Sequence, residues 1–586
     1  MWSSVLDLPD PVMALFRYFS LALSMTSLSL SAATDSSRCR CLYGQDCWPN
    51  DVAFSTFSQK LSQPLIRPTP IAATCYSNSS SSSCLDATTN FHNSTWRTDQ
   101  PGASQNINFE TYIRRNGTVE GCYLNVTLGD PCKQGSVPPI GVDARNSQDV
   151  QAAVRFVKEH NLKLVVKNTG HDYLGRSSGR GSFMVWTHHL KNKSYNETFV
   201  PLGGPSNATF SAITIGAGTL WAEAYEFVNE QGRVLVGGIA VGGSVGAAGG
   251  WVMGGGHSVL SPKYGLGVDN VLEFQVVLAD GSLVTANAYQ HSDLFWALRG
   301  GGGGTYGIVT AATYKTHPSF GVGQASFQAN FTSPEVAEKV MTATISATLN
   351  FTNAGWGGYL YIFPGFIAGI WVAPNASQAE TETAFTPFAS YLYNITGGQG
   401  GAVYNQTDSF YQWFYDMFVL GGDSQVGGNT YIASRLLSRE IAEHNPAQAA
   451  KALLSIPGSI GLNVIGGGAV NRVDPSLTGL NPSWRHSLAE VYVTEGWEDG
   501  SNATVIQQAA DRLKKNTDIL ENVSTDSGSY LNEGSLFERD FKKSYFGSHY
   551  SGLKAIKEKY DPTSVFIVAS GVSSEEWNKD LDCLLD

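Results

Sequence analysis

Residues 165–179 read Val165-Val166-Lys167-Asn168-Thr169-Gly170-His171-Asp172-Tyr173-Leu174-Gly175-Arg176-Ser177-Ser178-Gly179. This stretch is an apolar strand that runs directly into a glycine-rich turn carrying one histidine. The glycines can adopt φ > 0 and let backbone N–H groups approach a ligand closely, while Arg176 and the serines after it supply donors suited to a pyrophosphate. Taken alone, the stretch is equally compatible with a surface turn that happens to carry a histidine.

Three further segments of similar chemistry follow in the chain. Residues 237–258 are a long glycine-rich run that ends in Gly254-Gly255-Gly256-His257-Ser258. Residues 264–270 read Tyr-Gly-Leu-Gly-Val-Asp-Asn, and residues 300–310 begin with five consecutive glycines. Repeated glycine turns next to apolar strands favour a flat, phosphorylated ligand that is held by backbone dipoles. A lone glycine-rich loop would be a weak signal, but this ordered set is specific.

At these residues the chain resembles the vanillyl-alcohol-oxidase/p-cresol-methylhydroxylase flavoproteins, and within them the berberine-bridge-enzyme-like FAD oxidases of fungi and plants. The resemblance covers nearly all of the chain after its first residues, including a C-terminal signature around Tyr530-Leu531-Asn532. It implies an α+β fold with two parts. One is a two-subdomain FAD-binding domain of the p-cresol methylhydroxylase type, and the other is an α/β substrate domain whose antiparallel sheet lies over the flavin.

The resemblance also implies the cofactor and its ligands. His171 matches the histidine that bonds covalently to FAD in this family, so FAD is expected to be attached through His171. Many relatives add a second bond from a cysteine, but the aligned position here is Gly242, so one covalent link is expected. The other residues expected to bind FAD are Gly170, Leu174, Gly175, Arg176, Ser177, Gly243, Ser244, Gly246, Gly249, Gly250, Gly307, Ile308, Val309 and Asn532.

The catalytic residues are less clear from the sequence. The plant alkaloid enzyme has a glutamate shortly after a glycine pair, and in the corresponding run of this chain Asn471 or Arg472 falls near that place; neither is a carboxylate. Glu490 and Tyr492 lie on a nearby predicted strand, where a period of two puts both side chains on one face. We therefore take Tyr492, Glu490 and Asn471 as catalytic candidates, although packing in the core is the competing role for each of them.

Changes in composition and motifs along the chain predict five segments. These are a signal peptide at 1–33, a disulfide-tied N-terminal layer at 34–132, an FAD-binding domain at 133–318, a substrate domain at 319–528 and a berberine-bridge-like segment at 529–586 that returns to the FAD domain. Apolar residues spaced at i, i+3, i+4 and i+7 predict a helix over residues 147–159 with Ser147 as its N-cap, followed by a strand over 162–166. Further helices are predicted over residues 334–348, 434–443 and 504–517, and further strands over 358–362, 461–470 and 488–494.

Three features indicate the secretory pathway. Residues 17–33 combine Arg17, a short apolar run and a small-residue cleavage site, and the run is too short to span a bilayer of ~30 Å. The chain has 8 cysteines, an even number that fits disulfides in an oxidising compartment, although their pairing cannot be deduced. A zinc site at Cys39, Cys41 and Cys47 is the competing interpretation. Acceptor sequences for N-glycosylation begin at Asn78, Asn93, Asn116, Asn125, Asn192, Asn196, Asn207, Asn330, Asn350, Asn375, Asn394, Asn405, Asn502 and Asn522.

Composition limits the partners. A formal net charge of −12 argues against nucleic acid and anionic membranes, both of which need a concentrated positive surface. We expect a monomer without a metal site that acts on a small-molecule substrate and uses O₂. The leading hypothesis is an FAD oxidase that removes a hydride from a small natural product, in fungal secondary metabolism. The alternatives are a secreted carbohydrate oxidase and, from another class, a flavin-free binding glycoprotein.

Overall fold

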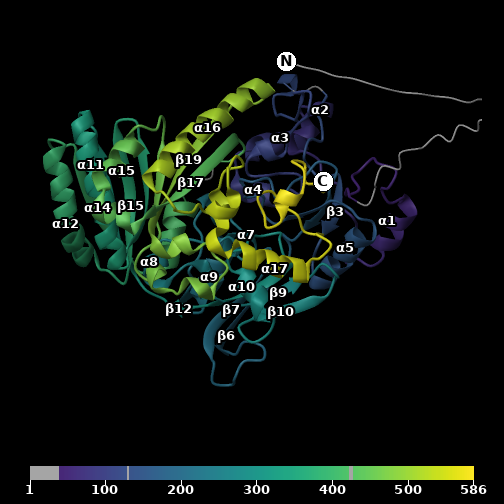
Figure 1. Cartoon of the computed structure of the whole chain (residues 1–586), viewed down its shortest axis with the longest axis horizontal. Coiled ribbons are helices and arrows are strands. Elements are labelled where there is room, and N and C mark those ends of the chain that lie inside the picture. The colour runs from purple at the N-terminus through teal and green to yellow at the C-terminus, as the bar shows by residue number, and fades with distance from the viewer. Residues whose placement is uncertain (1–37, 129–130, 421–425, 586) are drawn as a thin grey trace, which may run out of the picture.

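The computed structural model describes residues 38–128, 131–420 and 426–585. The predicted signal peptide therefore lies outside the described residues. Among the helices that are described, none is long and apolar enough to cross a membrane. Figure 1 shows two large bodies side by side, with one large sheet and its helices on the left and the smaller sheets below and to the right.

The N-terminal layer consists of short helices and loops tied by disulfides. Its helices are α1 (Asp51–Ser58), α2 (Thr74–Ser77), α3 (Ser82–Asn90) and α4 (Ser94–Thr98), and its only strand pair among the described residues is β1 (Tyr112–Ile113) with β2 (Val119–Glu120). The disulfides are Cys41–Cys47, Cys75–Cys84, Cys122–Cys132 and Cys39–Cys583. All eight cysteines are therefore paired, which excludes the zinc interpretation.

The next part of the chain forms two small sheets. Strands β3 (Ile140–Asp143), β5 (Phe183–Trp186) and β4 (Leu164–Lys167) pair in parallel, in that order. The second sheet has the order β10-β9-β11-β7-β6 and is antiparallel; its strands are β6 (Lys193–Phe199), β7 (Phe210–Gly216), β9 (Val271–Val277), β10 (Leu283–Asn287) and β11 (Ile308–Lys315). Helices α5 (Ser147–Glu159), α6 (Trp221–Glu230) and α10 (Ser292–Leu298) accompany them. Two sheets of this kind agree with a two-subdomain FAD-binding unit.

The predicted helix over residues 147–159 is confirmed as α5, and its predicted core residues are buried. The cap differs by one residue. Asn146, not Ser147, is the N-cap, because the Asn146 side chain accepts a hydrogen bond from the backbone N–H of Asp149. This bond satisfies one of the N–H groups that a helix leaves without a partner in its first turn.

The substrate side is built on a seven-stranded antiparallel sheet with the order β16-β13-β15-β14-β18-β19-β17. Its strands are β13 (Val322–Asn330), β14 (Gly357–Phe363), β15 (Phe366–Pro374), β16 (Gly400–Thr407), β17 (Asn429–Ser438), β18 (Ile460–Val464) and β19 (Ser487–Trp497). One face is covered by α11 (Pro334–Asn353), α12 (Gln378–Ile395), α14 (Arg439–His444), α15 (Pro446–Leu454) and α16 (Ala503–Val523), as Figure 1 shows. The other face is left for the site.

Two predictions in this region need correction. Residues 434–443 were expected to form one helix, but residues up to Ser438 belong to β17 and only Arg439–His444 are helical. Strand β17 pairs along its length with β19, so ladder hydrogen bonds and burial between two layers outweigh the local helix pattern. The strand expected over 461–470 ends at Val464, and Val470–Arg472 is a 3₁₀ turn.

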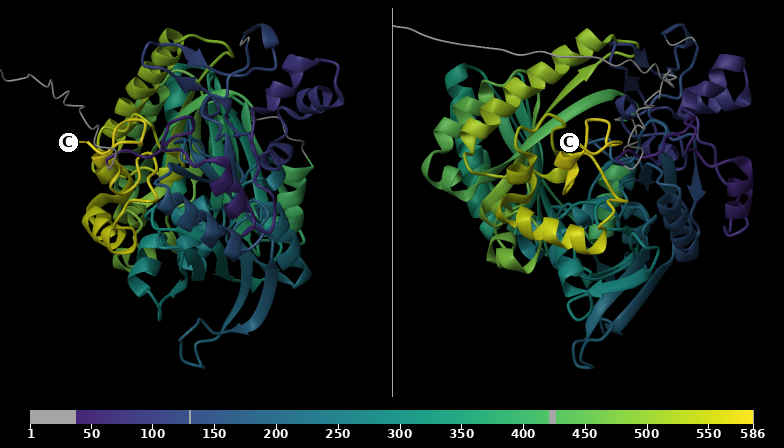
Figure 2. Two further views of the ribbon diagram at one scale, coloured as in Figure 1. Left: turned by 90° about the vertical axis from the view of Figure 1, so that its right-hand side faces the viewer. Right: turned by 45° about the vertical axis from the view of Figure 1, so that its right-hand side comes forward.

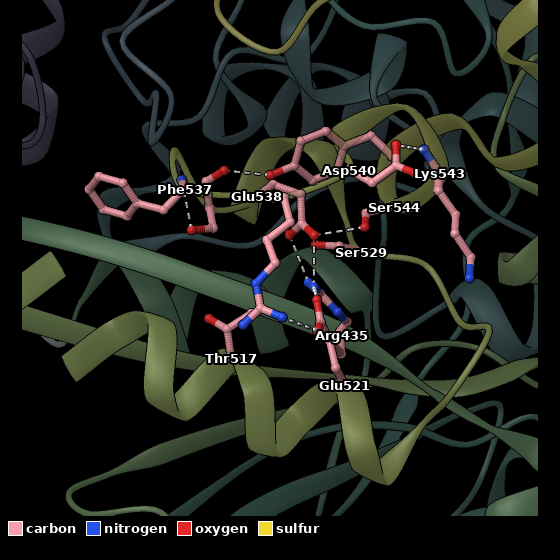
Figure 3. A network of polar contacts seen from close by, with 12 residues as sticks. Arg435, Thr517, Glu521, Ser529, Phe537, Glu538, Asp540, Lys543 and Ser544 are labelled. Atoms are coloured by element: carbon pink, nitrogen blue, oxygen red, sulfur yellow. Dashed lines mark hydrogen bonds and ion pairs between the residues drawn. The ribbon is translucent and has the colours of Figure 1, made fainter. Parts of the chain in front are cut away.

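The C-terminal segment contacts both bodies, and Figure 2 shows it running across the front of the molecule between them. Towards the FAD side, the buried Lys557 in α17 (Tyr550–Tyr560) donates to the backbone oxygens of Thr305 (2.7 Å) and Phe566 (2.6 Å). Towards the substrate side, Arg435 on β17 forms two hydrogen bonds with Glu538, at 2.8 and 2.9 Å, and also pairs with Glu521 (Figure 3). The segment thus contacts Thr305 on one side and Arg435 of the large sheet on the other.

Candidate functional site

A cavity of about 410 Å³ lies between the glycine loops and the open face of the large sheet. This volume is within the roughly 300–1,000 Å³ that is typical of small-molecule sites. Most of its lining comes from three parts of the chain. The glycine loops contribute Gly170, His171, Arg176, Ser177, Gly246, Gly249, Gly250, Gly307, Ile308 and Val309; the sheet contributes Tyr359, Tyr361, Ile432, Asn463, Tyr492 and Thr494; the C-terminal segment contributes Tyr530, Asn532, Glu533, Phe566, Ile567 and Val568.

His171 faces this cavity from the turn that follows β4. Its Nε2 lies 2.8 Å from Oγ of Ser244, and that hydroxyl is itself within 3.0 Å of the backbone oxygen of Val241. Burial lowers the pKa of His171 to about 4, so the imidazole is neutral at ordinary pH and retains a free lone pair. A neutral imidazole held by one nitrogen can act as a nucleophile through the other.

The turn around His171 is fixed by Asp172, which the sequence analysis did not select. Its carboxylate accepts hydrogen bonds from the backbone N–H groups of Leu174 (3.0 Å) and Ser177 (2.6 Å) and from the Ser177 hydroxyl (3.0 Å). Arg176 then reaches across to Asn532, to whose Oδ1 it donates at 2.9 Å. Asp172 therefore shapes the turn, while Arg176 and Asn532 connect it with the C-terminal segment.

Four of the expected FAD ligands do not line the cavity. Leu174 is buried in the core, and a Cβ added at Gly175 would meet the Phe109 ring at 3.1 Å. Gly243 has φ +60°, and a Cβ there would lie 2.6 Å from Ala222. Ser244 is fully buried and acts through His171. These residues hold the shape of the loops and do not face the cavity.

The remaining glycines form a cradle of accessible backbone. A Cβ added at Gly250 would meet no atom within 4 Å, so this backbone faces open space in the cavity. The buried Oδ1 of Asn168, another lining residue, has no hydrogen-bond partner among the described residues. Arg176 is the only lysine or arginine in the described lining, so phosphates would be held mainly by backbone N–H groups. The cradle and the unpaired acceptor fit a dinucleotide such as FAD.

The three catalytic candidates have different surroundings. Tyr492 lines the cavity and forms a hydrogen bond with Tyr361. Glu490 lies behind the wall and is 0% exposed. Asn471 is absent from the described lining, because it sits in the turn Val470–Arg472 and its side chain donates to the backbone oxygen of Arg485 at 2.7 Å.

Two residues at the centre of the site, His257 and Glu533, were not among the residues predicted from the sequence. His257 contacts Glu533 through Nε2 (3.1 Å) and the hydroxyl of Tyr359 through Nδ1 (3.3 Å). Glu490 lies 3.7 Å from the same Nε2. A signal was present in the sequence: His257 ends a glycine run, and Glu533 directly follows Asn532, which was selected.

Comparisons with known proteins find similarity over most of the chain. Residues 138–287 match the FAD binding domain family, and residues 529–573 match the berberine and berberine-like family. The chain is 35% identical over 571 residues to an uncharacterized FAD-linked oxidoreductase of Arthroderma benhamiae, covering 94% of this chain and 96% of the relative. It is 31% identical to the FAD-linked oxidoreductase malF of Malbranchea aurantiaca, covering 96% and 97%. The crystal structure of the VAO-type flavoprotein MtVAO713 from Myceliophthora thermophila C1 superposes with a TM-score of 0.82 at 27% identity, covering 94% of this chain and all of that one.

Proposed function

The chain belongs to the FAD-linked oxidoreductases with a berberine-like C-terminal segment, and from this we propose that it is an oxidase that removes a hydride from a carbon of a small natural product and passes the electrons to O₂. We place this reaction in fungal secondary metabolism. The observation that carries the proposal is one cavity in which His171 of the glycine turn faces tyrosines of the large sheet. Membership of an enzyme family argues against the flavin-free binding glycoprotein.

His171 would hold FAD by a single covalent bond. Two observations support this role: the low pKa of His171 and the hydrogen bond between its Nε2 and the Ser244 hydroxyl. The hydrogen bond leaves Nδ1 as the nitrogen available for attachment. Gly242 has φ +67°, a conformation that side chains rarely adopt, and glycine cannot supply a second, thioether link. Bound FAD would supply the hydride acceptor.

On the substrate side, tyrosines that line the cavity would position the reacting molecule, and a buried acid lies behind them. Burial raises the pKa of Tyr492 well above its ordinary value, so the Tyr492 hydroxyl donates hydrogen bonds and does not act as a base. Burial, and then the charge of Glu533, raise the pKa of Glu490, so this carboxyl favours its protonated form. We assign Tyr492 the role of a substrate donor and Glu490 that of a buried acid behind the wall; Asn471 receives no role.

We also propose that the enzyme is secreted or lumenal. All eight cysteines are paired, and every one of the predicted N-glycosylation asparagines is at least partly exposed, including Asn93 and Asn330, the least exposed of them. Attached glycans would therefore project from the surface without disturbing the core.

A carbohydrate oxidase is the second candidate, because aromatic rings continue outward from the cavity. Tyr361 is 44% exposed, its ring stacks 6.3 Å from that of Phe363, and Phe363 stacks 4.8 Å from Phe366. Such a row of ring faces could support a sugar chain.

The test starts with the purified protein. It should be yellow, and the colour should stay with the protein after denaturation in acid. Peroxide release should then be measured with benzylic alcohols, arylalkylamines and cellobiose. Peroxide from an alcohol or amine supports the leading proposal, and peroxide from cellobiose alone supports the carbohydrate oxidase. A colourless protein that takes up no added FAD would contradict both.

A further inference from the structure

Glu533 is a carboxylate that shares the cavity with five tyrosines, whereas the other acidic residue of the described lining, Asp172, accepts hydrogen bonds from the backbone of its own turn. Glu533 lines the cavity together with Tyr173, Tyr359, Tyr361, Tyr492 and Tyr530. These residues come from the His171 turn, from strands β14 and β19 and from the C-terminal segment, so only the folded chain brings them together. Building on the proposed oxidase function, we propose that this group is an ammonium-binding cage and that the substrate is an amine bound by its protonated nitrogen.

The carboxylate of Glu533 is held in place. Its Oε1 lies 3.1 Å from Nε2 of His257, whose Nδ1 lies 3.3 Å from the Tyr359 hydroxyl. The ring of Tyr530 packs against His257 at 5.1 Å. Despite these contacts the Glu533 side chain keeps 23% of its surface exposed. Since Glu533 lines the cavity, a ligand can reach its carboxylate without a rearrangement of the site.

A second acidic group lies directly behind the first. Glu490 is 0% exposed, its Oε2 accepts from Nδ2 of Asn463 at 3.3 Å, and its buried Oε1 has no hydrogen-bond partner among the described residues. Burying an acid without a full set of partners is unfavourable unless a cation or a proton compensates it. Burial and the charge of Glu533 together raise the pKa of Glu490, which shows that the two acids act on one another.

Glu533 has no lysine or arginine partner in the described lining of the cavity. The only lysine or arginine there is Arg176, which is engaged with Asn532 at 2.9 Å and lies 3.8 Å from Asp172. A substrate carboxylate or phosphate would therefore meet like charge at Glu533. A protonated amine would find an opposite charge and a hydrogen-bond acceptor at the same place.

The tyrosines strengthen the preference for a cation. Burial is the main cause that raises the pKa of each of the five, and the negative charge of Glu533 adds to it in each. All five therefore stay neutral and lie within the field of this carboxylate. Neutral phenol rings attract cations through their faces, and aromatic cages are a known means of binding ammonium groups.

A divalent metal ion is the competing occupant. One ligand atom from each of His257, Glu490 and Glu533 lies within 4.8 Å of the others. We favour the amine because the surrounding wall consists of aromatic rings, whereas metal sites are normally completed by further oxygen, nitrogen or sulfur ligands. The experiment must therefore separate an organic cation from a metal ion.

The experiment compares three ligands that each carry a phenyl ring but differ in their polar group. Holoenzyme is titrated with 2-phenylethylamine, 2-phenylethanol and 3-phenylpropionate, and binding is followed by calorimetry and by the flavin difference spectrum. We expect the amine to bind at least about tenfold more tightly than the alcohol, and the acid to bind most weakly, because a hydrogen bond to a charged group outweighs a neutral one. Glu533→Gln should remove this preference while leaving the affinity for the alcohol nearly unchanged.

Glu495→Gln is the matched control. Glu495 lies on β19, pairs with Arg512 at 2.8 Å and is absent from the described lining, so its substitution also replaces a glutamate by glutamine but leaves the cage untouched. It should leave the ratio of amine to alcohol affinity unchanged. Circular dichroism will show whether both variants are folded. If one variant does not fold, the comparison of the three ligands on the unmodified enzyme still tests the preference for an amine.

Several outcomes would overturn the proposal. Equal affinities for amine and alcohol, tighter binding of the acid, or no binding of any of the three would each reject the cage. Binding of one equivalent of Zn²⁺ or Mn²⁺ that excludes the amine and is lost in Glu490→Gln would assign the cluster to a metal. A colourless protein that still prefers the amine by calorimetry would reject the oxidase function and leave the cage intact.

Discussion

Nε2 of His171 lies 2.8 Å from Oγ of Ser244, and this contact joins two glycine-rich motifs that are 73 residues apart in the chain. Ser244 is fully buried, so it fixes the imidazole without competing for the ligand. The other ring nitrogen is then the one that can attach a flavin. The first two predictions follow from this pair.

His171→Ala should free the cofactor. Acid precipitation of the unmodified enzyme should leave its flavin in the pellet, whereas the variant should release nearly all of it into the supernatant. The measurement is the absorbance of the two fractions. His291→Ala is the control, because His291 is not in the described lining. Flavin that stays in the pellet of His171→Ala would show that another residue forms the bond.

Ser244→Ala should slow the attachment and leave non-covalent binding largely intact, because the imidazole loses the partner that orients it. Apoprotein mixed with FAD would be sampled over time, denatured and tested for bound flavin. Ser178→Ala, on the same turn as His171 but outside the described lining, should behave like the unmodified protein. An unchanged rate for Ser244→Ala would mean that the hydrogen bond has no role in attachment.

The disulfide Cys39–Cys583 should contribute more to stability than its neighbour Cys41–Cys47. The cysteines of the first disulfide are 544 residues apart in the sequence, and those of the second are 6 residues apart. A cross-link that closes a longer loop removes more entropy from the unfolded chain. We expect a loss of roughly 2–4 kcal/mol for the double serine variant of Cys39 and Cys583. The midpoints of denaturant unfolding provide the comparison, and a greater loss for the short loop would contradict it.

Arg435→Met should destabilise the contact between the large sheet and the C-terminal segment. The side chains of Arg435 and Glu538 are 5% and 2% exposed, so the variant leaves a buried carboxylate without its cation, at a cost of about 3–5 kcal/mol. Arg539→Met, which removes an exposed pair with Asp518, should cost about 1 kcal/mol or less. Similar losses in the two variants, measured by denaturant unfolding, would argue against this difference.

His317 should make the enzyme less stable in mild acid. Burial, helped by Lys315 and Arg233, lowers its pKa from 6.5 to about 4. Between these values the unfolded chain binds a proton that the folded protein does not, so stability falls as pH drops through this window, and the group has no such effect above it. His317→Gln should therefore show a shallower fall of melting temperature between pH 6.5 and 4. A parallel fall in both proteins would rule out this contribution.

The sequence by itself determined the cofactor half of the protein. The spacing of Val150, Ala153, Val154 and Val157 defines helix α5, and the glycine turn with His171 follows its strand directly. These are local signals, because helix periodicity and glycine turns depend on residues close in the chain. The family was predicted from a resemblance carried by the glycine motifs, and the FAD ligands remain predictions, of which Leu174, Gly175, Gly243 and Ser244 do not line the cavity.

The tertiary structure decided what depends on distant residues. It paired Cys39 with Cys583, turned residues up to Ser438 into a strand that pairs with β19, and excluded Asn471 from the cavity. It also assembled the cluster of His257, Tyr359 and Glu533, whose members are separated by as many as 276 residues and meet through contacts of 3.1 and 3.3 Å. Side chains this far apart carry no shared local pattern, and only burial and packing of the folded chain bring them into contact.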